Sequence, residues 1–301
     1  MERFRLEPSG PFSIEQANRY FGGWPVLASD PSAIVMAFPV EGWHTSAAVI
    51  VRQDARGVLT GEVHHAQDED AESAWRTALA ALSADVDGAG FQLVGQRDPV
   101  VGRLQAHFGT VRPVCFHTPY EAASALVIGH RLSIVQTRSI RVRLSQEHGD
   151  ALSVGDQHLF AFPRPQVVLE LDRYGPVVGE KMERLHGIAE AALAGRLDRE
   201  QLRRTPFVDA LAELRSLRGV GAFIAQGILI RGAGLADEVS DDEVTSQAVQ
   251  HAYELPDVPD RATILHLAEA WRPYRAWVTV LLHMWLRREG GPAFKRPGRR
   301  R

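Results

Sequence analysis

Two hydrophobic patterns divide the chain near residue 97. Before it, residues 33–40, AIVMAFPV, and residues 45–65 are rich in β-branched residues and predict strands, with a hairpin turn at residues 54–57. Residues 70–88 repeat alanine and leucine at helical spacing and predict a helix, while residues 91–96, FQLVGQ, predict one more strand. The first third is therefore expected to be a small mixed domain of sheet and helix.

After residue 97 the apolar spacing is helical. Thr118, Pro119 and Glu121 have the pattern of a capping box with proline at the first helical position, and they predict a helix that ends at Gly129. Further amphipathic stretches follow at residues 132–149, 179–197, 206–219, 246–255, 260–271 and 274–289. The predicted fold class is α+β, with an N-terminal domain at residues 1–96, an all-helical domain at residues 97–290 and a basic tail at residues 291–301.

The composition is that of an ordinary globular chain. The 301 residues are 45% hydrophobic and 24% charged, and no run of about 18 apolar residues predicts a membrane span. The N-terminus lacks the apolar core of a secretory signal, and the single cysteine, Cys115, excludes an internal disulfide framework. We therefore expect a cytoplasmic protein without membrane contact. The net charge of -3 argues weakly against bulk attraction to nucleic acid, but it leaves room for a local basic face.

A glycine turn joins two of the predicted helices. Gly219 and Gly221 tolerate backbone angles and close approaches that a Cβ forbids, and Val220 between them is expected to point inward. The first N–H groups of the following helix are unpaired within it and carry the positive end of its dipole. They favour an anion such as a DNA phosphate, although an ordinary helix–helix corner has the same pattern. An acidic segment, residues 235–243, follows downstream.

Three motifs, which follow one another along the chain in the order of the family, resemble the helix-hairpin-helix–GPD superfamily of DNA glycosylases. The hairpin motif, with its apolar helix and Arg-Gly pair, is carried by Leu214, Leu217, Gly219, Val220, Gly221, Phe223, Ala225, Arg231 and Gly232. Residues 268–286 resemble the family's A-E-x-W-[RK]-P-[WY]-R helix, and residues 98–144 resemble the segment that opens its helical domain. The first third is similar in kind to the N-terminal domain of the 3-methyladenine DNA glycosylase II branch.

The resemblance implies a base-excision repair enzyme that flips an alkylated purine of the 3-methyladenine type out of the duplex and hydrolyses its N-glycosidic bond. The transition state of such a reaction is oxocarbenium-like, so a carboxylate near the sugar would stabilise it. Counted from the first hairpin glycine, the position of the family's catalytic aspartate falls on Glu243, and Asp242 precedes it. Three alternatives follow: Glu243 serves in an adjusted pocket, Asp242 serves after a small loop shift, or catalysis is impaired.

The resemblance also assigns a base pocket and duplex contacts. Phe223 stands where bifunctional members carry a Schiff-base lysine, which implies a monofunctional enzyme with an aromatic side chain in its pocket. His283 falls at the place of a pocket aromatic on the last helix. In the wedge loop, residues 130–133, His130 replaces the family's glutamine and Arg131 occupies the place that wedges into the duplex. Each of these residues has a plainer alternative. Phe223 and His283 would be core residues, and Arg131 would be an exposed loop residue.

The family's hairpin holds a monovalent cation through main-chain carbonyls, which here would belong to Arg215, Leu217 and Gly219. No zinc or iron signature stands in the sequence, and no cofactor is expected to be required. We expect a monomer that binds double-stranded DNA with a damaged base. Two other hypotheses remain: a non-catalytic or weakly active damaged-DNA-binding protein of the same fold, and a helical protein whose hairpin binds a different partner.

Overall fold

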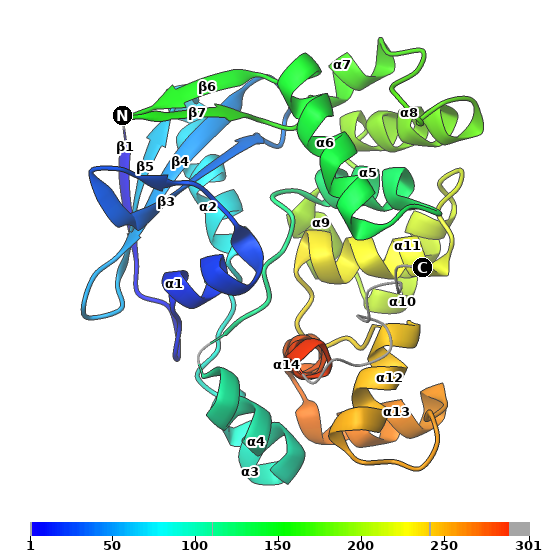
Figure 1. Ribbon diagram of the computed structural model, residues 1–301. Helices are drawn as coiled ribbons and strands as arrows, with labels where there is room; N and C mark the ends of the chain where they lie inside the picture. Colours follow the sequence, from blue (N-terminus) through cyan, green and yellow to red (C-terminus); the bar gives the residue numbers. More distant parts are fainter. Residues whose placement is uncertain (1, 110, 241, 289–301) are drawn as a thin grey trace, which may run out of the picture.

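The computed structural model describes residues 2–109, 111–240 and 242–288 (Figure 1). A sheet near the N-terminus is followed by a larger helical part, which confirms the predicted α+β fold class. The predicted basic tail at residues 291–301 lies outside the described residues.

A five-stranded antiparallel sheet forms the N-terminal part. Its strands follow the order β1-β5-β4-β3-β2 and comprise β1 (Glu2–Leu6), β2 (Val26–Leu27), β3 (Asp30–Pro39), β4 (Ser46–Gln53) and β5 (Leu59–His64). The predicted turn between β4 and β5 is confirmed, because the Gly57 N–H donates to the Asp54 carbonyl at 2.9 Å. The predicted helix that follows is α2 (Ala71–Ala81), which buries Trp75 and Leu79 in a core shared with the sheet.

A hairpin from the helical part covers another part of the sheet. β6 (Ala151–Val154) and β7 (Gln157–Phe160) bury Leu152 and Val154 in a small core with Ile50 of β4. Figure 1 shows both strands extended along the top of the sheet. Each strand is only four residues long, so its alternating polarity is too brief for the sequence pattern to predict it.

The helical part is built around two hydrophobic cores. The first contains α5 (Pro119–Gly129), α6 (Ile134–His148), α8 (Glu180–Leu193), α9 (Arg199–Arg204), α10 (Phe207–Arg215), α11 (Ala222–Ile228) and the π-helical turn η3 (Leu229–Ala233), with the short α7 (Pro165–Leu169) against α8. The second contains α3 (Phe91–Arg97), α4 (Pro99–Phe108), α12 (Glu243–Ala252), α13 (Arg261–Ala268), the turn η4 (Glu269–Trp271) and α14 (Arg275–Arg288). Figure 1 shows α14 end-on, with α3 and α4 to its lower left and α12 and α13 to its right.

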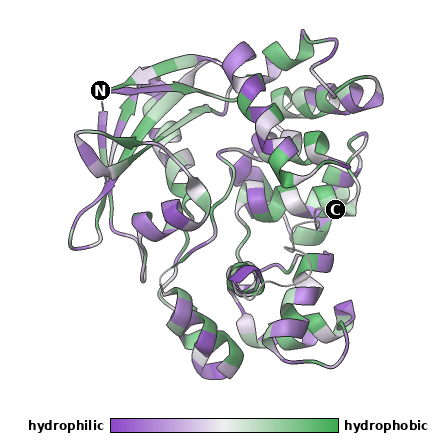
Figure 2. Ribbon diagram, in the orientation of Figure 1, coloured by the Kyte–Doolittle hydropathy of each residue, from purple (hydrophilic) through white to green (hydrophobic). Residues whose placement is uncertain are grey.

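Two helices near the surface matter for the site. The first is α1 (Ile14–Ala17), continued by the π-helical turn η1 (Asn18–Gly22). In α6 the buried residues are Ile140 and Leu144, and Figure 2 shows this helix largely hydrophilic. Both elements therefore present most of their side chains to solvent.

The strand predicted at residues 91–96 is wrong. These residues belong to the helix α3, and the Phe91 ring packs against Trp277 of α14 with 5.1 Å between ring centroids. A short apolar run does not by itself distinguish a strand from a buried helical turn, and here the packing against α14 decides. Because α3 also packs against α4, a domain boundary between residues 96 and 97 stays a prediction.

Asp98 joins several elements of the second core. Its Oδ1 caps α4 by accepting from the Val100 N–H at 2.9 Å, and its Oδ2 accepts from the Trp271 indole N–H at 3.0 Å and from the Tyr253 hydroxyl. Trp271 is fully buried. Since a buried N–H needs a partner, this carboxylate fixes the tryptophan of the W-R-P-Y-R motif in place.

A buried arginine links the N-terminal part to the hairpin helix. Arg199, at the start of α9, donates to the main-chain carbonyls of Phe116, His117 and Gly232. Glu41, in the connection between β3 and β4, interacts electrostatically with it. Loss of hydration on burial outweighs the attraction of Arg199 and raises the pKa of Glu41 to about 7.

Glu41→Gln is therefore expected to remove a pH dependence of stability. The pKa of Glu41 lies at about 7 in the folded protein against an ordinary value of 4.5, so its contribution is complete below pH 4.5 and is lost as the pH rises through 7. The substitution should change the free energy of unfolding little at pH 4.5 and raise it at pH 8, by at most about 3 kcal/mol. Urea unfolding of both proteins at the two pH values checks this, and an equal effect at both would contradict it.

Candidate functional site

The predicted hairpin lies between α10 and α11 (Figure 1). Gly219 adopts a φ of 78°, and a Cβ there would lie 2.5 Å from the Arg184 side chain, so glycine is required on both counts. Val220 is 4% exposed and fills the core, as predicted. Gly221, the N-cap of α11, is exposed with nothing within 4 Å of its Cβ position. The hairpin therefore presents the first turn of α11 on an open surface.

The acidic segment is tied to the start of α14. The Asp237 carboxylate lies 2.6 Å from Arg272 Nη1 and 2.8 Å from Arg275 Nε, and Arg275 is 7% exposed. Glu238 lies 3.5 Å from the Arg275 guanidinium. Both arginines of the W-R-P-Y-R motif thus hold the acidic segment, and its first two carboxylates are engaged in structural ion pairs.

The two candidate catalytic carboxylates differ in their surroundings. Asp242 is the N-cap of α12: its Oδ1 accepts from the Thr245 N–H at 2.8 Å, and its Oδ2 accepts from the hydroxyls of Ser240 at 2.6 Å and Thr245 at 3.1 Å. Glu243 is exposed, and its Oε1 accepts from the Gln247 side chain on the same helix at 2.9 Å. Asp242 is therefore fixed in one orientation, whereas Glu243 lies along the outer surface of α12.

His283 extends the arrangement around Asp242 onto α14. Its Nε2 lies 2.9 Å from the Thr245 hydroxyl, whose proton goes to Asp242, so the ring nitrogen is the donor. Burial lowers the pKa of His283, and the charge of Asp242 opposes this effect. A chain of hydrogen bonds thus runs from α14 through Thr245 to the carboxylate. The place of His283 in a base pocket stays a prediction.

An aromatic cluster near the end of α14 was absent from the predicted site. Trp285 contacts the rings of His107 and Phe108 at the end of α4, with 5.7 and 6.5 Å between ring centroids. Phe108 in turn contacts Tyr20 of η1 at 6.3 Å, and Tyr20 is 39% exposed. The cluster joins three elements far apart in sequence. In the sequence, the only sign of this cluster is that the last helix carries Trp285 in addition to Trp277, which is buried.

Phe223 and the wedge loop are exposed. Phe223, in the first turn of α11, is 57% exposed, which excludes the alternative of a core position. His130 and Arg131 are also exposed, and Arg131 has a φ of 61°, a left-handed conformation that few residues with a Cβ adopt. Ile134 follows at the start of α6 and is 79% exposed. These side chains face solvent on the helical part of the molecule.

The carbonyls predicted to hold a cation lie around the left-handed turn at Gly219. The Leu217 carbonyl accepts from the Val220 N–H at 3.1 Å and, like those of Arg215 and Gly219, offers a neutral oxygen. Within residues 2–288, apart from the undescribed positions 110 and 241, no group of histidine, cysteine and acidic side chains has the arrangement of a metal site. In the same part of the chain no helix has the length and apolarity needed to cross a membrane.

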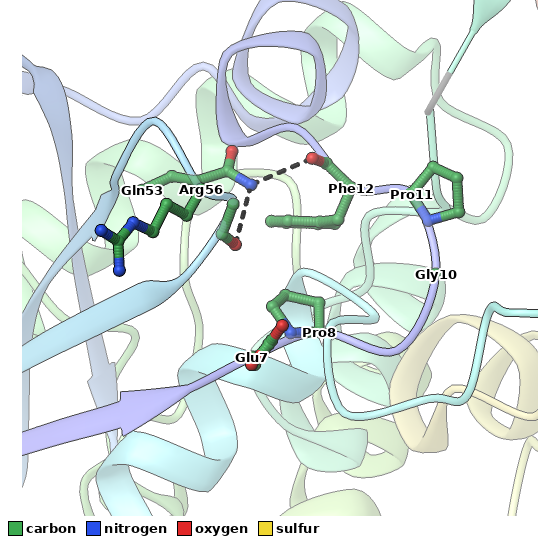
Figure 3. Close-up of a pocket in the computed structure, with 8 residues that line it drawn as sticks. Glu7, Pro8, Gly10, Pro11, Phe12, Gln53 and Arg56 are labelled. Atoms are coloured by element: carbon green, nitrogen blue, oxygen red, sulfur yellow. Dashed lines mark hydrogen bonds between the residues drawn. The ribbon is translucent and has the colours of Figure 1, made fainter.

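A cleft of about 360 Å³ lies elsewhere, between residues 7–12 and the turn after β4 (Figure 3). Its floor is tied together by Gln53, whose side-chain amide donates to the carbonyls of Phe12 at 3.0 Å and Gly57 at 3.2 Å. None of the residues that line it belongs to the predicted site. We therefore assign the cleft to the packing of the N-terminal segment on the sheet.

Comparison with known proteins agrees with this architecture. No protein-family model matches the chain. Two Bacillus subtilis (strain 168) proteins are 22% identical to it: a DNA-3-methyladenine glycosylase over 203 residues, 66% of this chain and 67% of that protein, and a putative DNA-3-methyladenine glycosylase over 184 residues, 60% and 62%. The second match thus spans less than two thirds of the relative's length.

Solved structures extend the likeness to nearly the whole chain. A 3-methyladenine DNA glycosylase from Archaeoglobus fulgidus has a TM-score of 0.74 at 17% identity, with 94% of this chain and 98% of that chain covered. An 8-oxoguanine glycosylase/lyase from Clostridium acetobutylicum, solved in complex with double-stranded DNA, has a TM-score of 0.67 at 14% identity, with 96% and 99% covered. The chain therefore has the fold of these DNA glycosylases.

Asp242→Asn is expected to lower the pKa of His283 further, because it removes the negative charge that opposes the effect of burial. An NMR titration of the imidazole signals measures the pKa in both proteins. Glu243→Gln is the matched control and should leave the pKa of His283 where it is, since Glu243 faces Gln247. An unchanged His283 pKa in Asp242→Asn would show that the ring does not sense this carboxylate.

Proposed function

We propose that the protein is a monofunctional DNA glycosylase of base-excision repair, which flips alkylated purines of the 3-methyladenine type out of double-stranded DNA and hydrolyses their N-glycosidic bond. The observation that carries the proposal is the Asp242 carboxylate, fixed at the start of α12 on the segment that follows the hairpin. The Bacillus and Archaeoglobus proteins bear the name of this activity, which supports the substrate class.

Asp242 is proposed to act on the sugar. As the base leaves with the bonding electron pair, positive charge develops on the sugar ring, and a carboxylate already held in place stabilises it without reorientation. Three donors occupy the Asp242 oxygens, so of about four acceptor sites one remains for the water that attacks C1′ and gives up its proton. His283 acts as a positioning residue, because its contact is with Thr245.

Aromatic rings that are exposed or half-buried are proposed to hold the extruded base. Phe223 is 57% exposed on α11, and Tyr20 and Trp285 belong to the cluster at the end of α14. An alkylated purine carries a formal positive charge, so its ring is attracted to the faces of aromatic side chains. The same charge makes the base a good leaving group, and a strong general acid is not needed. His283, on the same helix as Trp285, is proposed to border this pocket.

A lyase step is not proposed, because it requires a lysine. Phe223 stands at the lysine position of bifunctional enzymes, and the described part of the chain contains a single lysine, Lys181. Its ammonium donates to the carbonyls of Ile128 at 3.2 Å and His130 at 2.9 Å, next to the wedge loop. The monofunctional assignment rests on this distribution of lysines.

Contacts with the duplex are proposed for the hairpin and the wedge loop. The open first turn of α11 at Gly221 would receive a backbone phosphate, and a monovalent cation on the carbonyls of Arg215, Leu217 and Gly219 would strengthen that contact. Arg131, with His130 beside it, would fill the space that the extruded base leaves in the stack. Binding of this kind is local, and it does not need a positive net charge.

Base release from methylated duplex DNA tests the proposal. Native protein is expected to release 3-methyladenine or 7-methylguanine. Asp242→Asn should slow release at least about 100-fold in single turnover, because it removes the charge that stabilises the transition state. The matched variant Glu243→Gln should change the rate by less than about threefold. All three proteins should bind the duplex with the steep salt dependence of phosphate contacts.

Each of the other possible outcomes leads to a different conclusion. Duplex binding without base release by the native protein would overturn the catalytic proposal and leave a damaged-DNA-binding protein of the same fold. A failure to bind the duplex in a salt-dependent way would point to a different partner for the hairpin. Loss of release in Glu243→Gln with activity kept in Asp242→Asn would move the reaction to Glu243.

A further inference from the structure

Lys181 occupies an unusual place in a chain that prefers arginine. The sequence has 34 lysine and arginine residues in total, of which only Lys181 and Lys295 are lysines. Lys181 lies in the first turn of α8, and its ammonium donates to the carbonyls of Ile128 and His130. These carbonyls stand at the C-terminal end of α5, where the helix has no further N–H to offer them. Lys181 of α8 therefore supplies hydrogen bonds to carbonyls at the end of α5.

The loop that Lys181 holds is conformationally restricted. Arg131 is left-handed, with a φ of 61°, a conformation that is unfavourable for a residue with a Cβ. The Leu132 N–H donates to the Gly129 carbonyl at 2.9 Å and closes a tight turn beside it. On the other side, Ser133 forms a reciprocal capping box with Gln136 at the start of α6. The exposed Arg131 thus lies between the turn that Leu132 closes on Gly129 and the capping box at Ser133.

The same turn of α8 also touches the hairpin. Arg184 lies over Gly219, since a Cβ on that glycine would be 2.5 Å from the Cγ and Cδ of the arginine. Glu183, its neighbour, pairs with Arg218 of the hairpin at 2.6 Å. Within one turn of α8, Lys181 therefore contacts the wedge loop, while Glu183 and Arg184 contact the hairpin.

Four cations meet at this junction, Arg131, Lys181, Arg184 and Arg218, and two carboxylates partly balance them: Glu180 pairs with Arg184 and Glu183 with Arg218, each at 2.6 Å. Burial lowers the pKa of Lys181, and the nearby guanidinium groups of Arg131 and Arg184 lower it further. A polyanion lying across the wedge loop and the hairpin would relieve this repulsion. The junction is therefore suited to a DNA backbone, and it does not depend on the net charge of the chain.

We propose that Lys181 is a positioning residue for base extrusion, which fixes the direction of Arg131 relative to the hairpin. The inference rests on the proposed function, in which Arg131 enters the stack while the hairpin holds the backbone. Extrusion costs free energy because the base must be unstacked and unpaired, and a wedge offsets that cost only when its loop keeps its conformation. A compact ammonium can satisfy two carbonyls from one point, which the planar fork of a guanidinium does less well.

The test compares one alkylated purine in two duplexes, paired normally or placed as a single unpaired bulge that needs less unstacking. Lys181→Met removes the donors and keeps an unbranched side chain that is only one atom shorter. It should slow single-turnover release from the paired duplex roughly tenfold and from the bulge less than about twofold. Arg56→Met, which removes one exposed positive charge in the turn after β4, is the matched control and should slow neither.

A double-mutant cycle separates positioning from a general structural role. In the Arg131→Ala background, Lys181→Met should slow release less than about twofold further, since Lys181 acts through Arg131. Equal slowing on both duplexes, or the full tenfold effect without Arg131, would overturn the inference. If Lys181→Met does not fold, Lys181→Arg keeps the charge and should show the same preference for the bulged duplex; no preference would contradict us.

A failure of the proposed function would look different. Native protein would then release no base from either duplex, whatever the residue at position 181. Extrusion can still be followed without chemistry, by the fluorescence of 2-aminopurine placed next to the lesion in the paired duplex. Native protein and Arg56→Met should raise this fluorescence on binding, and Lys181→Met should raise it less. Equal signals from native protein and Lys181→Met would overturn the role of Lys181 independently of catalysis.

Discussion

The contact between Asp237 and the two arginines at the start of α14 is the constraint on which the site depends. Arg275 reaches Asp237 through Nε to the carboxylate and through Nη2 to the main-chain carbonyl, while Arg272 binds the carboxylate from its other side. Charge-assisted bonds of this kind are stronger than neutral ones and offset the cost of burying Arg275. Because the acidic segment is held there, the N-terminus of α12 lies against α14, where His283 reaches Thr245 and Thr245 holds Asp242.

Two groups of basic residues differ in what their charges can do. Arg112 and Arg199 are buried and donate to main-chain carbonyls, so they act as internal cross-links and offer no charge to a ligand. Around the wedge loop and the hairpin, Arg131, Lys181 and Arg184 lie close enough to one another to shift a pKa. A net charge of -3 therefore says little about DNA binding, which depends on where the remaining cations are placed.

Most of the fold followed from local sequence patterns, because caps, turns and apolar spacing act over a few residues. The β4–β5 turn, the α5 cap at Thr118 and the hairpin with Val220 inside were predicted in this way. The strand expected at residues 91–96 failed because packing on α14 decides the conformation of so short a run. The aromatic cluster of Trp285, Phe108 and Tyr20 and the bonds of Lys181 join distant elements. No local spacing contains that information, nor could counting along the acidic segment separate Asp242 from Glu243.

In the proposed reaction, Asp242 is the carboxylate that faces the sugar of the extruded nucleotide. The most direct measurement is a crystal structure of the native protein with a duplex in which a cationic pyrrolidine replaces the sugar of the lesion nucleotide. We expect the ring nitrogen within hydrogen-bond distance of Asp242, with Glu243 still bonded to Gln247 and a phosphate at the hairpin. A pyrrolidine bound beside Glu243, or a duplex bound away from α12, would contradict the account.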